Sequence, residues 1–309
     1  MTVPINNWEA HAAAEPAVVA LDRIPTWFGV GGGAKRFCRP TSEGQLARCL
    51  GIDPELRVLG DGANLIVDDE GVDELVVALD AGEFTVTATE GERVIAGAGV
   101  RLPRLITRCV SEGLAGLEGL GGIPASVGGA VVMNAGGAFG QIADAVSEVH
   151  AVTRGGGSVV LRRQEIAFGY RTSGLQDLII TRVVFHLRRE DPALLRRRLL
   201  EVMDYKKKSQ PLGDNSAGCC FKNPTLERDV DGIGRAGERA SAGMVIDRAG
   251  LKGLRVGSAV VSEVHGNFLV AEKGGCARDV ITLMERVEAA VRERFGIELR
   301  REVVVWRKQ

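Results

Sequence analysis

The 309-residue sequence lacks the features that mark several classes of protein. Its 39 basic and 40 acidic side chains leave a formal net charge of −1, so no overall field attracts nucleic acid or an anionic membrane. No window holds the roughly 18 uninterrupted apolar residues of a membrane span. The N-terminus has no basic segment followed by an apolar core, as a secretory signal would. We therefore expect a cytoplasmic protein that has neither nucleic acid nor a membrane as a partner.

The sequence also lacks the spacings of common metal, disulfide and nucleotide motifs. Its six cysteines show no CxxC spacing, which argues against a zinc site and against a disulfide-stapled secreted domain. It contains no HExxH zinc motif and no GxxxxGK[ST] phosphate loop, and its four histidines are scattered. Kinase, ATPase and metalloprotease functions lose their main support. We predict reduced thiols and no metal site.

Two segments match the GxGxxG dinucleotide fingerprint, GVGGGA at 29–34 and GIGRAG at 232–237. That fingerprint binds pyrophosphate where a buried strand precedes it and a helix follows it. Pro40 soon follows the first match, and the charged segment LERDVD precedes the second. Neither segment is therefore expected to form a Rossmann loop.

Glycine is abundant, with 41 residues. The segment from Gly113 to Gly140 is GLAGLEGLGGIPASVGGAVVMNAGGAFG, and glycine lets backbone approach a ligand where a side chain would collide. This stretch forms either irregular packing or a cofactor cradle. A second glycine turn, in VLGDGANLIV at 58–67, separates two short apolar strands.

Apolar periodicity predicts helices and strands that alternate without a βαβ rhythm, so the expected class is α+β. The predicted helices cover 102–110, 192–208, a short stretch of 242–250 that Gly250 caps, and 280–291, and a strand covers 299–306. The second helix is charged and looks like a connector at a domain boundary. Its Lys206–Lys208 run is either a solvated helix face or a phosphate contact.

Three segments carry unlike chemistry: FGYRTS at 168–173, SAGCCFKNP at 216–224 and REVVVW at 301–306. Together with LGDGANLIV and GGIPASVGGAVVMNAGGAFG, they occur in the order found in one enzyme family. From about residue 24 to its end, the chain resembles the UDP-N-acetylenolpyruvoylglucosamine reductase (MurB) family.

The resemblance implies a fold of two domains. Residues 20–190 would form a two-lobed FAD-binding domain of the PCMH or vanillyl-alcohol-oxidase type, split near residue 83. A connecting helix at 191–208 would lead to a smaller α+β substrate-binding domain at 209–309. The extension at 1–20 receives no role, and no oligomer is implied.

The resemblance also implies an activity, that of an FAD-dependent oxidoreductase in peptidoglycan precursor synthesis. NADPH reduces FAD and leaves, and the flavin then reduces UDP-N-acetylglucosamine enolpyruvate to UDP-N-acetylmuramate. Hydride arriving on one carbon builds enolate charge on its neighbour and on the attached carboxylate. Such a site needs cations to hold that charge and an acid to quench it.

In this family FAD is wrapped by glycine turns instead of a single βαβ loop. The residues implied to bind FAD are Gly60, Asp61, Gly62, Ala63, Asn64, Leu65, Gly122, Ile123, Pro124, Ala125, Ser126, Gly128, Gly129, Asn134, Ala135 and Gly136. The sequence departs from the family at Asp61, where glycine is common, and at Ala125, where a third glycine is usual.

The resemblance assigns catalytic roles to Arg171, Cys219 and Glu302. Arg171 would hold the substrate carboxylate and the enolate by its fork of donors, and Glu302 would assist by sharing a proton with that carboxylate. Cys219 stands where the family has the serine that protonates the enolate carbon. A thiol, with an ordinary pKa of about 8.5, is a better acid than an alcohol and is mostly protonated at neutral pH.

Each of these residues also has a structural interpretation. Arg171 could form a salt bridge, Glu302 could be a strand residue paired with an arginine, and Cys219 could pack as a small hydrophobe. On a strand, Cys219 and Cys220 point to opposite faces, so at most one serves a given site.

Substrate contacts are implied for Tyr170, Lys207, Asn223 and His265. Two other functions stay open from the residues alone. One is an FAD oxidoreductase of the same fold that acts on another substrate, and the other is a flavin-binding protein without turnover.

Overall fold

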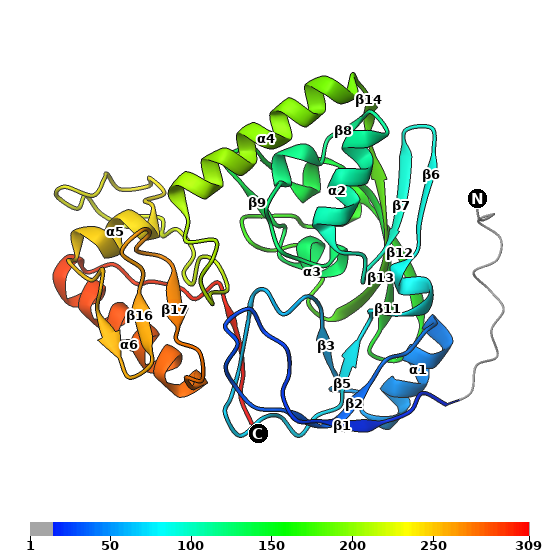
Figure 1. Ribbon diagram of the computed structural model, residues 1–309, viewed down its shortest axis with the longest axis horizontal. Helices are drawn as coiled ribbons and strands as arrows, with labels where there is room; N and C mark the ends of the chain where they lie inside the picture. The colour runs from blue at the N-terminus through cyan, green and yellow to red at the C-terminus, as the bar shows by residue number, and fades with distance from the viewer. Residues whose placement is uncertain (1–14, 309) are drawn as a thin grey trace. The chain divides into compact units, whose positions relative to one another are not determined.

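The structure is a computed structural model that describes residues 15–308 (Figure 1). Its contacts group the chain into two compact units. Unit 1 consists of the described residues up to Leu21 together with Ala34–Asp61 and Glu74–Tyr205, and unit 2 of Asp22–Gly33, Gly62–Asp73 and the residues from Lys206 on. Of the extension at 1–20, residues 1–14 lie outside the described residues.

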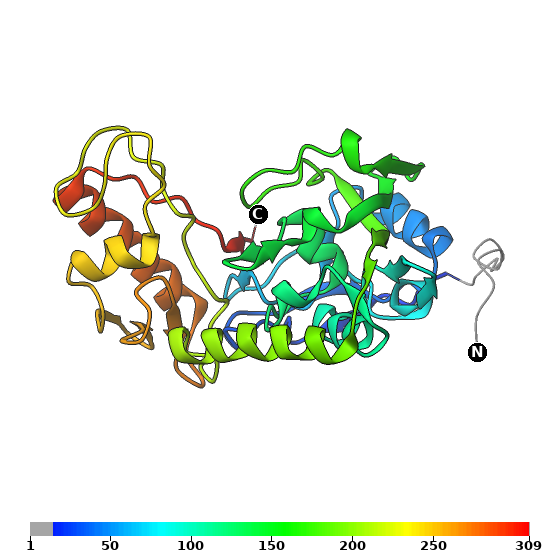
Figure 2. The same ribbon diagram turned by 90° about the horizontal axis from the view of Figure 1, so that it is seen from above.

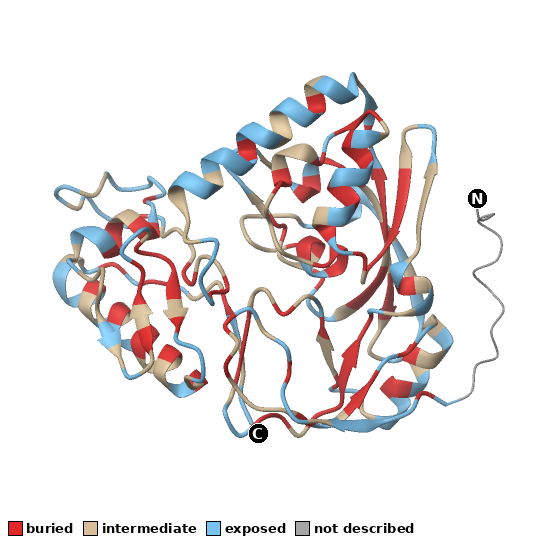
Figure 3. Ribbon diagram, in the orientation of Figure 1, coloured by how far each residue is buried: buried red, intermediate tan, exposed pale blue. Residues whose placement is uncertain are grey.

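The largest sheet of unit 1 is antiparallel and has the strand order β12-β11-β13-β7-β6. Its strands in chain order are β6 (Thr87–Glu90), β7 (Arg93–Gly97), β11 (Val146–Thr153), β12 (Ser158–Arg162) and β13 (Leu178–His186). Figure 3 shows that β7 and β13, near its centre, are mostly buried, whereas β6 at the edge is not. Most side chains of these central strands are apolar, which suits strands that are largely covered.

A second sheet of unit 1 has the order β1-β2-β5-β3. It consists of β1 (Val19–Leu21), β2 (Ala34–Cys38), β3 (Arg57–Leu59) and β5 (Val76–Ala78). Strand β5 runs parallel to both of its neighbours. Smaller pairs join β8 (Leu114–Ala115) to β14 (Arg188–Arg189) and β9 (Gly136–Gly137) to β10 (Gly140–Gln141).

Short helices cover these sheets: α1 (Glu43–Ile52), α2 (Leu102–Ser111), α3 (Val127–Val132) and the 3-10 turns η2 (Gly82–Thr85), η3 (Glu118–Leu120), η4 (Ile142–Asp144) and η5 (Arg163–Glu165). Helix α1 begins at Ser42, whose hydroxyl accepts the Gln45 amide and so satisfies an amide at the helix start. Helix α2 buries the predicted apolar face, and Gly113 follows its end with a φ of 69°. The helix predicted at 102–110 is therefore confirmed.

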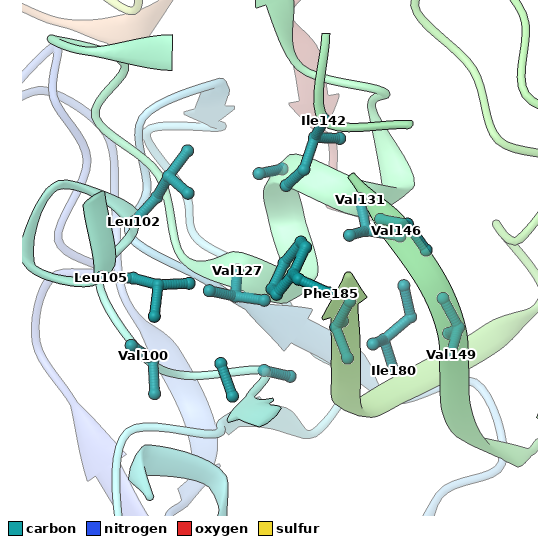
Figure 4. Packing of buried hydrophobic residues seen from close by; sticks show 14 of the residues in the cluster. Val100, Leu102, Leu105, Val127, Val131, Ile142, Val146, Val149, Ile180 and Phe185 are labelled. Carbon is teal, nitrogen blue, oxygen red and sulfur yellow. The ribbon is translucent and has the colours of Figure 1, made fainter. Parts of the chain in front are cut away.

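The core of unit 1 forms where α2 and α3 pack on the large sheet. Phe185 of β13 is fully buried, and Figure 4 shows it among Val127 and Val131 of α3 and Leu105 of α2. Because burial of such side chains supplies most of the favourable free energy of folding, this layer stabilises the loops that leave the ends of α2 and α3.

Unit 2 contains α5 (Ala242–Arg248), α6 (Ala277–Phe295) and the antiparallel sheet β15-β16-β17. Its strands are β15 (Arg255–Val256), β16 (Ala259–Val261) and β17 (Leu269–Ala271). Figure 2 shows α5 beside α6, and α6 buries the predicted apolar face against this sheet. Gly296 ends α6 with a φ of 66°, a left-handed conformation that favours glycine.

The last strand of the chain, β18 (Val304–Trp306), pairs in parallel with β4 (Leu65–Val67) in unit 2. It is shorter than the strand predicted at 299–306, because residues 300–302 are hydrogen-bonded to the segment at 220–222 and only 304–306 pair with β4. The first strand of this pair comes from the glycine-turn segment at 58–67.

The compact units differ from the predicted domains in two segments. The sequence assigns 22–33 and 62–73 to the FAD-binding domain, and in the structure both belong by their contacts to unit 2. Helix α4 (Pro192–Ser209) occupies the place of the predicted connector. The unit boundary, between Tyr205 and Lys206, falls inside this helix.

The mixture of helices with mainly antiparallel sheets confirms the α+β class. Among residues 15–308, no helix combines the length and the apolarity needed to cross a bilayer.

We predict that Phe185→Ala lowers the free energy of unfolding by about 3–5 kcal/mol, because truncation of a buried aromatic ring leaves a cavity. Urea denaturation followed by circular dichroism measures the change. The control is Val160→Ala in β12, where the side chain is 55% exposed and the expected change is within about 0.5 kcal/mol. Equal effects of the two substitutions would contradict the proposed core.

Candidate functional site

The predicted cofactor residues of unit 1 come from three segments, 60–61, 122–129 and 134–136, and the first two lie against each other. A methyl group on Gly60 would lie 2.7 Å from the Ser126 hydroxyl. Ser126 is buried and accepts the Gly129 amide at 3.3 Å, which caps α3. The two segments approach so closely that position 60 favours glycine.

The two departures from the family pattern are accommodated in this region. Asp61 pairs with Arg101, with Nε 3.4 Å from the carboxylate. Ala125 is half-buried and packs on the core of unit 1, and its carbonyl accepts the Leu102 amide at 2.8 Å. Neither side chain therefore displaces the glycine-rich backbone.

Asn134 supports the glycine-rich loop from inside. It is 3% exposed and has a φ of 41°. Its Nδ2 donates to Gly169 O at 2.9 Å and to Gln141 Oε1 at 3.0 Å, and its Oδ1 accepts the Ala143 amide. Through these bonds, Asn134 connects the glycine-rich loop to the FGYRTS segment.

Arg171 lies in a tight turn of that same segment. Gly169 and Thr172 exchange backbone hydrogen bonds across the turn, and Arg171 has a φ of 56°. Its Nη1 donates to Gly136 O at 2.8 Å, and its guanidinium carbon lies 5.7 Å from the centre of the Tyr170 ring.

Within residues 15–308, Asn134 and Arg171 are the non-glycine residues with positive φ. Strained backbone of this kind concentrates at functional sites and persists where surrounding bonds hold it. The structure thus brings the predicted residues Asn134, Gly136, Tyr170 and Arg171 together in unit 1.

Cys219 and Cys220 lie in a strand-like segment of unit 2 and differ sharply in environment. Cys220 is fully buried, and burial raises the pKa of its thiol to about 12. Cys219, which lies opposite Phe268 in a single bridge, is partly exposed. The two side chains therefore occupy different faces, as strand alternation predicts.

Glu302 lies on an extended segment that is hydrogen-bonded to Cys220. Its amide donates to Cys220 O at 2.8 Å, and its carbonyl accepts Asn64 Nδ2 at 3.1 Å. Asn64 O in turn accepts the Val304 amide, and Leu65 begins the buried strand β4. Asn64 and Leu65, both predicted to bind FAD, are thus held against the C-terminal segment of unit 2.

The remaining predicted substrate residues of unit 2 have different surroundings. Asn223 Oδ1 accepts the Ala242 amide at the start of α5, and Lys207 is exposed on α4. His265 Nδ1 accepts the Asn267 amide at 3.1 Å, and burial lowers the pKa of this imidazole.

Asn267 is a residue that sequence reasoning missed. It is 2% exposed and bonds to both Cys220 and Phe221. A signal was available, since an asparagine beside the apolar run FLVA must have hydrogen-bond partners when it is buried.

No group of three or more His, Cys, Asp or Glu side chains within residues 15–308 is arranged to hold a metal ion.

Comparison with known proteins places both parts of the chain in one family. Residues 34–162 match the FAD binding domain model, and residues 210–306 match the C-terminal domain of UDP-N-acetylenolpyruvoylglucosamine reductase. The protein of that name from Thermus thermophilus is 44% identical over 279 residues, which cover 90% of this chain and 95% of its own length. A Symbiobacterium thermophilum relative is 39% identical and covers 90% of this chain and 87% of its own.

A solved structure agrees with these relatives. The crystal structure of UDP-N-acetylenolpyruvylglucosamine reductase (MurB) from Thermus caldophilus has a TM-score of 0.79 and 42% sequence identity. The match covers 94% of this chain and 99% of the Thermus chain.

We predict that iodoacetamide labels Cys219 in the folded protein and spares Cys220, because the Cys220 thiol is buried with a pKa of about 12 and the thiolate is the reactive form. Mass spectrometry of peptides after brief labelling distinguishes the two positions. Labelling in denaturant, where both thiols react, is the control. Faster labelling of Cys220 would mean that the strand faces the other way.

We also predict that stability falls as the pH drops below about 6.5, the ordinary pKa of histidine. The pKa of His265 is lowered in the fold, so the unfolded chain binds the extra proton and acid favours unfolding. His265→Asn keeps an acceptor for the Asn267 amide and should flatten the dependence of the unfolding free energy on pH. His150, whose pKa burial also lowers, would supply the remaining slope. An unchanged slope in His265→Asn would contradict this assignment.

Proposed function

The chain belongs to the UDP-N-acetylenolpyruvoylglucosamine reductase family, and we propose that Arg171, Cys219 and Glu302 carry out its reaction. That reaction is the NADPH-dependent reduction of UDP-N-acetylglucosamine enolpyruvate to UDP-N-acetylmuramate, a step in peptidoglycan precursor synthesis. The protein is an FAD-dependent oxidoreductase with a PCMH-type FAD domain and the C-terminal domain of the family.

The residues of unit 1 fit the flavin cofactor. Gly60 approaches Ser126 closely, and residues 122–125 beside them are partly exposed, so backbone in this region can come near a ligand where a larger side chain would collide. We assign the segments 60–61, 122–129 and 134–136 to FAD. We assign 62–65 to it as well, although their unit is unit 2. When bound, FAD accepts hydride from NADPH and supplies it to the enolpyruvyl double bond.

Arg171 would hold the substrate carboxylate and the enolate charge that develops on it. Its bond to Gly136 O fixes one nitrogen of the guanidinium, so the planar fork is oriented before the substrate arrives. Donors fixed in this way stabilise developing charge without the cost of reorganisation. The turn that carries Arg171 supports this role, because tight turns and strain of this kind accompany functional positions.

Cys219 would donate the proton that completes the reduction. Hydride reaches one carbon of the double bond, and the neighbouring carbon takes a proton from the Cys219 thiol as its S–H bond breaks. The thiolate then regains a proton from solvent. The partial exposure of Cys219, beside a Cys220 that is buried and protonated, supports this choice between the two thiols.

Glu302 would share a proton with the substrate carboxylate and so neutralise charge on it. Its backbone is bonded to Cys220 O, which places it on the strand beside the segment that carries Cys219. Cys219 and Glu302 thus lie on hydrogen-bonded segments of a single unit.

Substrate recognition is assigned to Tyr170, Lys207, Asn223 and His265. Lys207 is an exposed point charge on α4 and suits a diphosphate. Tyr170 lies against Arg171, and Asn223 and His265 lie on loops of unit 2 that flank the strand segment of Cys219. The partners are therefore NADPH and the UDP-sugar enolpyruvate.

A cytoplasmic location is supported by the cysteines. All six lie within the described residues and are free thiols, as is usual in a reducing compartment.

We predict that Cys219→Ala still lets NADPH reduce the flavin but slows flavin reoxidation by the enolpyruvyl substrate roughly 10²- to 10⁴-fold, the usual contribution of a positioned acid. Cys219→Ser should keep much of the wild-type rate, because a hydroxyl can also donate. Stopped-flow absorbance in the flavin band follows each half-reaction separately.

The matched control is Cys220→Ala, which should leave both half-reactions nearly unchanged. Unimpaired reoxidation in Cys219→Ala would remove Cys219 from the mechanism, and an equal loss in Cys220→Ala would mean that the wrong cysteine is assigned. A flavin-binding protein without turnover would show no reoxidation by the substrate even in the wild type.

A further inference from the structure

Asn267 is buried beside the strand segment that carries Cys219. Its side chain and backbone together are 2% exposed, and it lies in the connection between β16 and β17. Its carbonyl accepts the Cys220 amide at 2.9 Å, and its own amide donates to His265 Nδ1 at 3.1 Å. A buried polar residue with this many partners has a specific structural task.

The carboxamide of Asn267 binds both backbone groups of Phe221. Its Oδ1 accepts the Phe221 amide at 2.9 Å, and its Nδ2 donates to the Phe221 carbonyl at 2.8 Å. The carboxamide thus makes the two hydrogen bonds to Phe221 that a neighbouring strand would otherwise make. With the bond to Cys220, three hydrogen bonds fix two successive residues directly after Cys219.

The other edge of the same segment is bonded to the strand of Glu302. Cys220 O accepts the Glu302 amide at 2.8 Å, and the Lys222 amide donates to Arg300 O at 2.8 Å. The segment is therefore held from both sides, and Asn267 supplies the side-chain part of that restraint.

We propose that Asn267 is a positioning residue, which holds the 219–221 segment so that the Cys219 thiol faces the carbon that it protonates. This inference rests on the proposed role of Cys219. Asn267 touches neither substrate nor flavin in this proposal and acts through the backbone of Cys220 and Phe221. A misplacement of the donor by about 1 Å can cost a catalytic step about 10²-fold.

The test is Asn267→Ala, which removes the carboxamide and keeps the backbone bonds to Cys220 and His265. We expect flavin reoxidation by saturating substrate to slow up to about 10²-fold. Flavin reduction by NADPH and the substrate concentration at half-saturation should stay at wild-type values, because a general loss of structure would disturb those too. Stopped-flow absorbance gives all three quantities.

A double-mutant cycle with Cys219→Ala separates the two proposals. If Asn267 acts through the thiol, Asn267→Ala should cause little further slowing in the Cys219→Ala background. Normal reoxidation in Cys219→Ala alone would defeat the role of Cys219. Four outcomes would overturn the role of Asn267. In the single variant Asn267→Ala these are normal reoxidation, equal slowing of both half-reactions, and loss of flavin. In the double variant the outcome is a slowing equal to the product of the slowings in the two single variants.

The matched control is Ser262→Ala. Ser262 is buried in the same connection and accepts the Val264 amide at 3.2 Å, and we expect neither half-reaction to change. If Asn267→Ala does not fold, Asn267→Ser enters the same cycle, since its hydroxyl retains one hydrogen-bonding group, and the same outcomes decide.

Discussion

The hydrogen bonds on the two sides of Cys220 are the constraint on which the proposed catalytic segments of unit 2 depend. On one side the Cys220 amide is bonded to Asn267, and on the other its carbonyl is bonded to the Glu302 amide. Buried backbone groups must be paired. Because Cys220 is buried, its two hydrogen bonds determine how the segment at 219–222 aligns with the segment at 300–302. The same burial that makes Cys220 inert therefore gives Cys219 and Glu302 their places.

In unit 1, hydrogen bonds between turns fix the positions of the predicted site residues. The strained residues Asn134 and Arg171 are linked by reciprocal bonds, since Asn134 binds Gly169 O and Arg171 binds Gly136 O. Each turn is held in its left-handed conformation by a bond to the loop that contains the other. The glycine-rich loop and the guanidinium thus form one arrangement, and a change in either would shift both.

The sequence predicted those features that local patterns encode. Apolar periodicity predicted α2 and α6. The order of the motifs predicted the family, and the roles of Arg171, Cys219 and Glu302 stay predictions. The sequence did not predict that the 62–73 segment packs with unit 2, because that packing depends on pairing between β4 and β18, which lie more than two hundred residues apart in the chain. Such long-range pairing leaves no trace in local periodicity. Asn267 was missed for a related reason, since the partner of its carboxamide, Phe221, lies far from it in sequence.

The substitution of a thiol for the usual hydroxyl at position 219 raises the question of what keeps a thiol protonated. A nearby cation would favour the thiolate, and a nearby anion disfavours it. Glu302 lies one strand away, and its negative charge is among the causes that raise the pKa of Cys220, after burial. The carboxylate that we propose to assist the substrate thus also opposes thiolate formation at Cys220. A cysteine can take the place of the serine as an acid because a thiol with an ordinary pKa of about 8.5 is mostly protonated at neutral pH.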